Sequence, residues 1–430
     1  MLARNSLKLS KIICKPRVKV NLVPRKIKSG ISVLKKEGVL GFSIAALQSI
    51  QKGRRSRADG TSSNSIYYQV DPREILKADP SKPPPRWPGT TKTRLRLNWV
   101  MPPPGKGSGG HMDIFRFIQA LENAGHSCTI YLYSYENPAT IAQVIAEMGD
   151  SYPRLKAKMY WLRGGKMAPA DAIFATSWDT AYPVYNDPSN AKRFYMIQDF
   201  EPYFYQVGGL YLLAENTYRF GFYGITLGPW IAKKLKPYRM KADFVDIGVD
   251  AATYKFDNRN RRKEILFYAR PYTGRRGFEI GILALDLFHR KHPGYKINML
   301  GYDVSQYDIP FPYENLKVLE HDQLNELYNR CAAGLVMSLT NMSLLPLELL
   351  ACGAIPVVND GENNRMVSDN KFIEYSAGEP HLLADKLAQA VAKAGPRQAA
   401  EAAKSVAGLS WEKSAQKLVR IVEREIKKLS

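Results

Sequence analysis

The 430-residue sequence has few cysteines and no long apolar run, and these absences exclude several classes of protein. No Cys-x-x-Cys pair and no histidine cluster occurs, so neither a disulfide framework nor a zinc site is indicated. No stretch reaches about 18 apolar residues, so the sequence predicts no membrane-spanning helix. Asp-x-Asp, a common carboxylate motif for magnesium or manganese, is also missing, and we expect no bound metal. The four scattered cysteines favour a reducing compartment, the cytoplasm: Cys14, Cys128, Cys331 and Cys352.

Acidic residues are scarce relative to basic ones, with 40 Asp and Glu against 62 Lys and Arg, which gives a net charge of +22. Residues 1–60, the N-terminal arm, hold 15 of the basic residues but only Glu37 and Asp59 as acids. Nucleic acid is not expected as a partner, because the arm lacks the aromatic side chains that stack on bases. We expect the arm to lie on an anionic membrane surface, with the short apolar stretch Gly41–Ile50 in the interface. A solvated arm without a partner is the alternative.

The rest of the chain alternates between strand-like and helix-like segments, which predicts an α/β protein with two doubly wound domains. Residues 1–92 comprise the arm and a Pro- and Ser-rich linker, expected to be partly disordered, and order is expected to begin at Arg94. The first domain is assigned to residues 93–250 and the second to 251–410. An amphipathic closing helix is expected over 411–430.

The segment Ala333–Asp360 carries the clearest indication of a ligand site. Ala333–Ser338 is typical of a buried parallel strand, a helix is expected from Pro346, and Ala354–Val358 is the next strand. A strand that leads into a helix N-terminus at the carboxyl edge of a parallel sheet is a natural place for a phosphate. Glu348 lies one turn inside this helix. Its carboxylate could hold ribose hydroxyls, or simply favour the positive helix end.

Three arginines follow the strand predicted over Ile265–Ala269, namely Arg270, Arg275 and Arg276. They are expected at the carboxyl edge of the second sheet, where ligands of open sheets bind. Cations there would stabilise a departing diphosphate. A solvated basic turn is the alternative.

These two segments together resemble the donor site of the retaining glycosyltransferases of family 4, which have the GT-B fold. The family signature is Glu, seven residues, Glu, then a small-residue helix that ends in Gly, then Pro-Val-Val. Glu348 matches the second Glu, and Ala351–Val358 fits the remainder. Thr340 stands where the family often has the first Glu. The family's Gly-Arg-x4-Lys-Gly pattern is matched by Ala269–Gly277, with one residue inserted.

A narrower resemblance, to the WsaF-type rhamnosyltransferases, is carried by Met196–Tyr205 and Tyr218–Thr226. It implies transfer of L-rhamnose, with retention, from dTDP-β-L-rhamnose to a growing cell-surface polysaccharide. No cofactor is implied besides this nucleotide-sugar co-substrate. A transferase that uses a UDP- or GDP-sugar is one alternative. A non-catalytic glycan- or nucleotide-binding module of the same fold is another, because Thr340 replaces a carboxylate.

The resemblance also assigns residues to the two sides of the site. Diphosphate binding falls to the arginines and ribose binding to Glu348, so that Arg270, Arg276 and Glu348 are the predicted catalytic residues. On the donor side the full set is Arg270, Arg275, Arg276, Tyr302, Thr340, Ser343, Leu344, Leu345 and Glu348.

On the acceptor side, Gly109 and Gly110 would let the backbone approach a ligand closely. The segment 198–205 combines aromatic faces with carboxylates, as sugar binding requires. A rigid aromatic loop is the alternative for that segment, and a helix-capping role is the alternative for His111. The acceptor is expected to be a glycan, with a lipid-linked glycan as one option. The predicted acceptor-side residues are Gly109, Gly110, His111, Asp199, Glu201 and Tyr203.

Overall fold

The computed structural model describes residues 69–428, except 106, 136, 138 and 165. The predicted membrane contact of the N-terminal arm lies outside these residues. Among the helices described, none is both long and apolar enough to cross a bilayer.

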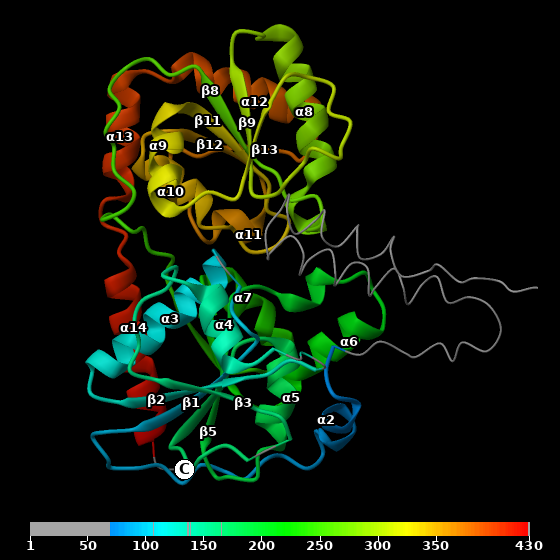
Figure 1. Cartoon of the computed structure of the whole chain (residues 1–430), viewed down its shortest axis with the longest axis vertical. Helices are drawn as coiled ribbons and strands as arrows, with labels where there is room; N and C mark the ends of the chain where they lie inside the picture. The colour runs from blue at the N-terminus through cyan, green and yellow to red at the C-terminus, as the bar shows by residue number, and fades with distance from the viewer. Residues whose placement is uncertain (1–68, 106, 136, 138, 165, 429–430) are drawn as a thin grey trace, which may run out of the picture. The chain divides into compact units, whose positions relative to one another are not determined.

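Two wholly parallel sheets organise the described residues, with helices between most successive strands (Figure 1). The first has the order β3-β2-β1-β4-β5-β6-β7 and the second β10-β9-β8-β11-β12-β13. The predicted α/β class with two doubly wound domains is therefore confirmed. Strands of the first sheet are β1 (Arg96–Met101), β2 (Ser127–Leu132), β3 (Lys158–Trp161), β4 (Ala172–Ala175), β5 (Lys192–Ile197), β6 (Tyr223–Leu227) and β7 (Ala242–Val245). Strands of the second are β8 (Glu264–Tyr268), β9 (Lys296–Leu300), β10 (Glu314–Lys317), β11 (Cys331–Val336), β12 (Ile355–Asn359) and β13 (Glu374–Ser376).

The helices alternate with these strands along the chain. Up to β7 they are α2 (Pro72–Lys77), α3 (Gly109–Asn123), α4 (Ile141–Met148), α5 (Trp178–Asn186), α6 (Gly209–Asn216) and α7 (Pro229–Leu235), with the 3-10 turns η1 (Glu201–Phe204), η2 (Thr217–Arg219) and η3 (Lys236–Tyr238). After β8 come the turn η4 (Gly274–Arg276) and the helices α8 (Phe278–Lys291), α9 (His321–Arg330), α10 (Leu345–Ala351), α11 (Glu362–Arg365), α12 (Pro380–Lys393), α13 (Pro396–Val406) and α14 (Trp411–Lys427).

Each sheet is held by apolar side chains that the sequence places on buried strands. In the first sheet, Trp99 stacks on Phe174 with ring centroids 4.1 Å apart, and Phe174 stacks on Phe194 at 4.8 Å. These residues pair across β1, β4 and β5, so the rings form a ladder through the centre of the sheet. In the second sheet, Gly281 lets α8 approach β8, because a Cβ there would lie 2.2 Å from the ring of Phe267.

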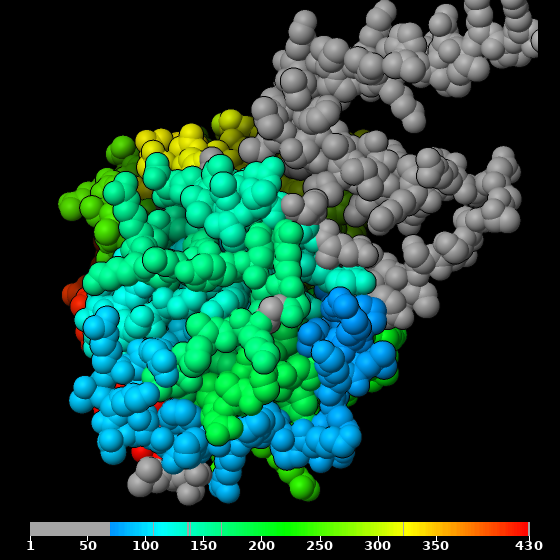
Figure 2. Space-filling view, turned by 60° about the horizontal axis from the view of Figure 1, so that its bottom comes forward, coloured from blue at the N-terminus to red at the C-terminus, as the bar shows by residue number. Residues whose placement is uncertain are grey.

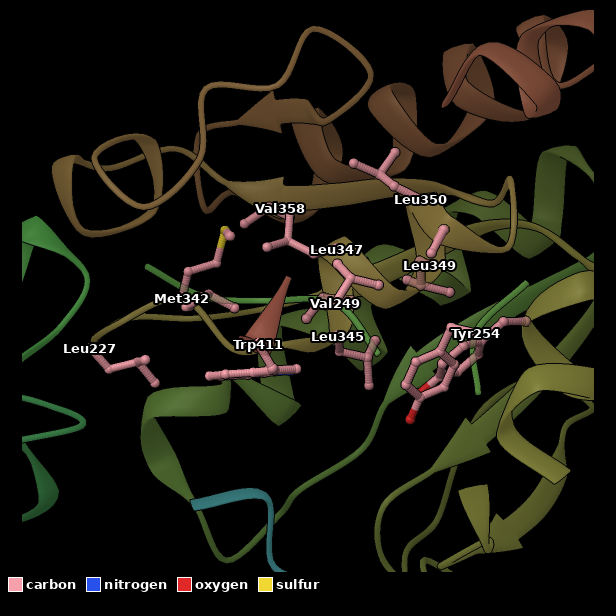
Figure 3. Packing of buried hydrophobic residues seen from close by; sticks show 14 of the residues in the cluster. Leu227, Val249, Tyr254, Met342, Leu345, Leu347, Leu349, Leu350, Val358 and Trp411 are labelled. Carbon is pink, nitrogen blue, oxygen red and sulfur yellow. The ribbon is translucent and has the colours of Figure 1, made fainter. Parts of the chain in front are cut away.

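Helix α14 packs on helix α3 and on strand β7 of the first sheet. Trp411 lies at its first turn, 6.3 Å from the ring of Phe117 and 5.0 Å from the guanidinium of Arg116. Its Ser414 hydroxyl donates to the carbonyl of Asp246, 2.7 Å away. Figure 3 shows Trp411 within the same hydrophobic cluster as the leucines of α10.

Described structure is already present in residues 69–93, so the prediction that order begins at Arg94 is wrong. Asp71 caps α2, and Val70 is fully buried. The indole N–H of Trp87 donates to the carbonyl of Ile426, 2.8 Å away on α14. Figure 2 shows this segment, in blue, covering part of the surface. The composition indicates a linker because polar and proline-rich segments carry few apolar residues, but it says nothing about partners far along the chain.

Candidate functional site

The three predicted arginines lie just after β8, at the carboxyl edge of the second sheet. Arg270 follows the strand directly, and η4 carries Arg275 and Arg276. Gly277, with φ of +53°, then turns the chain into α8. Because β8 lies between β9 and β11, this edge also receives the segments that follow those two strands. The amide of Leu339, after β11, donates to the carbonyl of Arg275, 2.9 Å away.

Arg270 and Arg276 form no ion pair within the described residues, and the carboxylate of Asp199, which acts on Arg276 from nearby, is paired with Arg275. The Nη1 of Arg276 donates to the Ser338 hydroxyl at 2.5 Å, and burial lowers the pKa of this guanidinium from its usual value. Arg270 lies over the ring of Tyr268, 5.7 Å from its centroid. A partly desolvated cation without a counter-charge is costly, so this edge is suited to an anionic ligand.

Arg275 has a different environment, because its partner comes from the first sheet. Its Nε lies 3.4 Å from Oδ2 of Asp199, which follows β5, and its guanidinium lies 4.0 Å from the ring centroid of Phe204. The same Asp199 accepts from the Thr340 hydroxyl at 2.7 Å and from the Asn341 amide at 2.9 Å. Asp199 therefore places a carboxylate beside Thr340, the position at which the sequence lacks the expected Glu.

Glu348 lies in α10 and is half-buried. The Tyr328 hydroxyl donates to its Oε2 at 3.5 Å. Burial raises the pKa of Glu348 to about 7, although the charge of Arg116 opposes the shift. Helix α10 begins at Leu345, so Glu348 is in its first turn as predicted, and Pro346 is near the N-terminus.

Asp113 on α3 is a second carboxyl with a raised pKa. It is fully buried, and burial raises its pKa to about 7 against the opposing charge of Arg116. Arg116 donates to Asp113 at 3.2 Å and to Asp250 at 3.4 Å. One guanidinium thus serves two carboxylates, and a third, Glu348, is near enough to influence Asp113. Sequence reasoning did not find this cluster, because its members come from three separate segments: α3, the residues after β7, and α10.

Replacement of Asp113 by Asn should produce a pH-dependent gain in stability. The pKa of Asp113 is about 7 in the folded protein and about 4 in the unfolded chain. Its contribution is therefore present below about pH 4 and lost as the pH rises through about 7. The melting temperature of Asp113→Asn relative to the native protein should rise between about pH 4 and about pH 7, then level off. The exposed Asp369→Asn is the control, and a pH-independent difference for Asp113→Asn would refute the assignment.

The predicted acceptor-side glycines open α3 and lie against other predicted site residues. A Cβ at Gly109 would be 3.8 Å from Leu344, and one at Gly110 would be 3.4 Å from the amide of Gln198. The Gln198 Nε2 donates to the Gly110 carbonyl at 3.0 Å. The start of α3 is thus next to the segments that follow β5 and β11.

His111 has both ring nitrogens engaged within its own loop. The Ser108 hydroxyl donates to Nδ1 at 2.9 Å, and Nε2 donates to the carbonyl of Pro102 at 3.2 Å. Burial lowers the pKa of His111, which keeps the ring neutral. Neither contact reaches a backbone N–H of α3, so His111 links the loop before the helix to Ser108 without capping the helix, and its contact with sugar hydroxyls stays a prediction.

Glu201 has a structural position rather than one facing an acceptor. It is buried, and its Oε2 accepts from the amide of Trp178 at the start of α5, 2.5 Å away. Burial raises its pKa well above the usual value. Tyr203, two residues on, is 41% exposed and accepts from Lys234 at 2.9 Å. The aromatic and acidic composition predicted an acceptor-side position for both Glu201 and Tyr203. Composition alone does not show which way each side chain of η1 points.

The remaining predicted donor-side residues have mixed environments. The Ser343 hydroxyl is buried without a hydrogen-bond partner, and its amide donates to the Ser338 hydroxyl at 3.3 Å. Leu345 is buried in the hydrophobic cluster, so only its backbone is available to a ligand. The ring of Tyr302 lies edge-on to the exposed Tyr272, with centroids 4.8 Å apart.

A group of asparagines near Ser338 was missed by the sequence analysis. The side chains of Asn359, Asn363 and Asn364 all donate to the Ser338 carbonyl, at 2.9, 2.8 and 3.0 Å. They fix the loop that carries Thr340. The signal was available, because Asn359 ends β12 and the other two asparagines follow it, so all three reach the same edge of the sheet. No group of three or more His, Cys, Asp or Glu side chains within the described residues is arranged to hold a metal ion.

Comparison with known proteins supports the same fold. Residues 263–388 match the family model described as the WsaF C-terminal domain. The O-antigen biosynthesis protein RfbC of Myxococcus xanthus is 29% identical over 337 residues, which cover 75% of this chain and 26% of that protein. The chain thus spans about a quarter of the length of this curated relative.

Two solved structures resemble the chain along most of its length. Anabaena HepE in complex with UDP-glucose has a TM-score of 0.58 at 12% identity, covering 77% of this chain and all of the other. WaaG, a glycosyltransferase involved in lipopolysaccharide biosynthesis, has a TM-score of 0.54 at 13% identity, covering 76% of this chain and 99% of the other. The chain therefore has the two-domain α/β fold of the GT-B glycosyltransferases.

Proposed function

We propose that this protein is a glycosyltransferase that transfers a sugar from a nucleotide-sugar to a growing cell-surface polysaccharide. The observation that carries the proposal is the pair Arg270 and Arg276, which lie at the carboxyl edge of the second sheet without a carboxylate partner in the described structure. A donor diphosphate would supply the missing negative charge. The buried, unpartnered hydroxyl of Ser343 would supply a further hydrogen bond at the same place.

The donor in this proposal is dTDP-β-L-rhamnose, and transfer retains the anomeric configuration. Support comes from the match of residues 263–388 to the WsaF C-terminal domain and from the O-antigen relative. A UDP- or GDP-sugar is the alternative, and HepE, of similar fold, has been solved with UDP-glucose.

The proposed reaction is a front-face substitution. The bond between the anomeric carbon and the diphosphate oxygen breaks, and the acceptor hydroxyl forms the new glycosidic bond on the same face. The hydroxyl proton passes to the departing diphosphate. Arg270 and Arg276 stabilise the charge that develops there, and the protein otherwise acts by holding the two reactants in position. Asp199, held by Thr340 and Arg275, is the carboxylate that the geometry places nearest to the missing Glu.

A panel of nucleotide-sugars tests the proposal. A ligand of the folded state at about 100 times its Kd stabilises the protein by about 2.7 kcal/mol, so dTDP-β-L-rhamnose should raise the melting temperature more than UDP- or GDP-sugars. Incubation with an acceptor glycan should then release dTDP. Binding without release would identify a non-catalytic module, and the absence of any shift across the panel would refute the function.

Replacement of Glu348 by Gln should weaken donor binding by about 1–3 kcal/mol, the range for a hydrogen bond to a charged group. Because the pKa of Glu348 is about 7, its carboxylate is mostly ionised only at higher pH, and the loss should grow from about pH 6 to about pH 8. Titration calorimetry at both pH values measures this. Glu401→Gln, at an exposed position on α13, is the control. A collapsed melting temperature with unchanged affinity per folded molecule would make Glu348 a structural residue instead.

Transfer should persist when divalent cations are removed with EDTA. The sequence has no Asp-x-Asp motif, and in this proposal the arginines take the part that a metal plays at other diphosphate sites. Initial rates before and after chelation measure the effect. A strict requirement for added magnesium or manganese would contradict metal-independent transfer.

The acceptor in this proposal is a glycan, with a lipid-linked glycan at the cytoplasmic face of the plasma membrane as one option. The N-terminal arm would hold the protein peripherally on that face, through its basic residues and anionic lipids.

A further inference from the structure

A patch of exposed apolar side chains lies in the segment between β5 and β6. It consists of Tyr203, Phe204, Val207 and Leu212, whose exposed fractions are 41%, 38%, 90% and 54%. No residue from Tyr203 to Ala214 carries a charge. Val207 lies in the short connection between η1 and α6, which pack on each other, and we call these four side chains the apolar patch. Helix α6 is visible in Figure 1. Exposed apolar residues gathered in this way mark a surface that meets another molecule.

The apolar patch is firmly attached to the first domain. The indole N–H of Trp178 donates to the Tyr205 hydroxyl at 2.8 Å, and that hydroxyl donates to Gln69 at 2.6 Å. Leu210 and Leu213 pack against the hydrophobic cluster on the inner side of α6. Val207 and Leu212 are exposed, whereas their neighbours pack against the hydrophobic cluster. These two side chains therefore contribute little to the stability of the core.

Lys234 borders the apolar patch and two further cations follow it in the chain, whereas the acid next to the patch, Glu215, is engaged within the protein. Lys234 donates to the Tyr203 hydroxyl, and Lys236 and Arg239 follow on exposed positions of η3 and its end. None of the three has an ion pair in the described part of the chain. Glu215, at the end of α6, accepts from the Tyr238 hydroxyl at 2.8 Å and pairs with Arg219.

We propose that the apolar patch is a membrane-docking surface of the folded domain, which inserts its apolar side chains between anionic phospholipids while Lys234, Lys236 and Arg239 contact the headgroups. Uncharged apolar and tyrosine side chains bordered by cations are the chemistry that an anionic bilayer surface recognises. The surface is separate from the N-terminal arm and does not depend on the identity of the donor.

The apolar patch lies close to the candidate donor site. The guanidinium of Arg275 lies 4.0 Å from the ring centroid of Phe204. The turns that carry these residues, η1 and η4, pack on each other. The docking surface is therefore adjacent to the arginines of the candidate site. An acceptor attached to lipid would reach the site at the edge where the protein meets the membrane.

A fluorophore at Val207 tests the proposal in the full-length chain. In a Cys14→Ser background, in which the native cysteines of the described residues are buried, Val207→Cys is labelled with the environment-sensitive dye NBD. Vesicles containing about 30% phosphatidylglycerol in phosphatidylcholine should shift its emission to the blue and raise the intensity about twofold. Label at Leu283→Cys, 55% exposed on α8, is the matched control and should not respond.

A second measurement uses co-sedimentation with the same vesicles. Val207→Asp with Leu212→Asp should weaken binding about tenfold without lowering the melting temperature, because both side chains are exposed, whereas Leu283→Asp should bind normally. An unchanged emission from label at Val207 while the protein sediments with vesicles would assign all binding to the arm and overturn the proposal. A blue shift without vesicles that grows with protein concentration would show a second copy of the chain as the occupant, and would also overturn it.

Discussion

Simultaneous replacement of Arg270 and Arg276 by alanine is expected to lower the transfer rate by at least about 10³-fold, since removal of one preorganised donor at a developing charge already costs about 10²–10³. Binding of a nucleoside diphosphate should fall below detection in the same variant. The reason is that both cations lie at the carboxyl edge of the second sheet without a protein carboxylate. Their charge is available to a ligand, and the ligand loses both partners at once.

Calorimetric titration with dTDP, together with initial rates of transfer, measures both effects. Arg397→Ala, whose side chain is 94% exposed on α13, is the matched control and should leave both unchanged. Arg276 donates to Ser338, so its removal could disturb the β11 loop. Arg270→Ala alone avoids that difficulty, because the contact described for Arg270 is with the ring of Tyr268. Native donor affinity in the single and double variants would refute the assignment of the diphosphate site.

The part of the site that the sequence predicts well is the part governed by sheet geometry. Ala333–Ser338 reads as a buried strand because it is short and apolar, and the structure has β11 two residues earlier, at Cys331–Val336. Once β8 and β11 are parallel neighbours, the residues that follow them must meet at one edge. That rule brings Arg276 to Ser338 and would also have found the asparagines at the end of β12. The rule uses only the order of neighbouring strands, once for β8 with β11 and once for β11 with β12. It needs no knowledge of contacts between distant residues.

The parts that sequence reasoning did not find depend on long-range packing. The contact between Asp199 and Thr340 joins residues 141 positions apart, and nothing in either local sequence selects the other. Glu201 is turned inward by a free amide at the start of α5, although its neighbours Asp199 and Tyr203 face elsewhere. The short strands β3, β7 and β13 have only three or four residues, too few to show a pattern.

Replacement of Asp199 by alanine is the second change with a large expected effect. It leaves the Thr340 hydroxyl and the Asn341 amide without an acceptor, and it leaves Arg275 without its carboxylate. Removing one partner of a buried charge pair typically costs about 3–5 kcal/mol, because the other charge remains uncompensated. Arg275 is about one quarter exposed, so we expect the lower part of that range, about 3 kcal/mol in the free energy of unfolding.

Chemical denaturation of four proteins separates the contributions: the native chain, Asp199→Ala, Arg275→Ala and the double variant. If the two side chains interact as the 3.4 Å distance indicates, the double variant should be more stable than the sum of the single losses by about 1–3 kcal/mol. Thr340→Val, which removes one hydrogen bond and leaves the charge pair, should cost only about 1 kcal/mol. Additive losses would show that Asp199 and Arg275 act independently. In that case Asp199 would hold only the loop after β11, Arg275 would be free to join the other two arginines on a diphosphate, and the carboxylate beside Thr340 would have no part in orienting the donor.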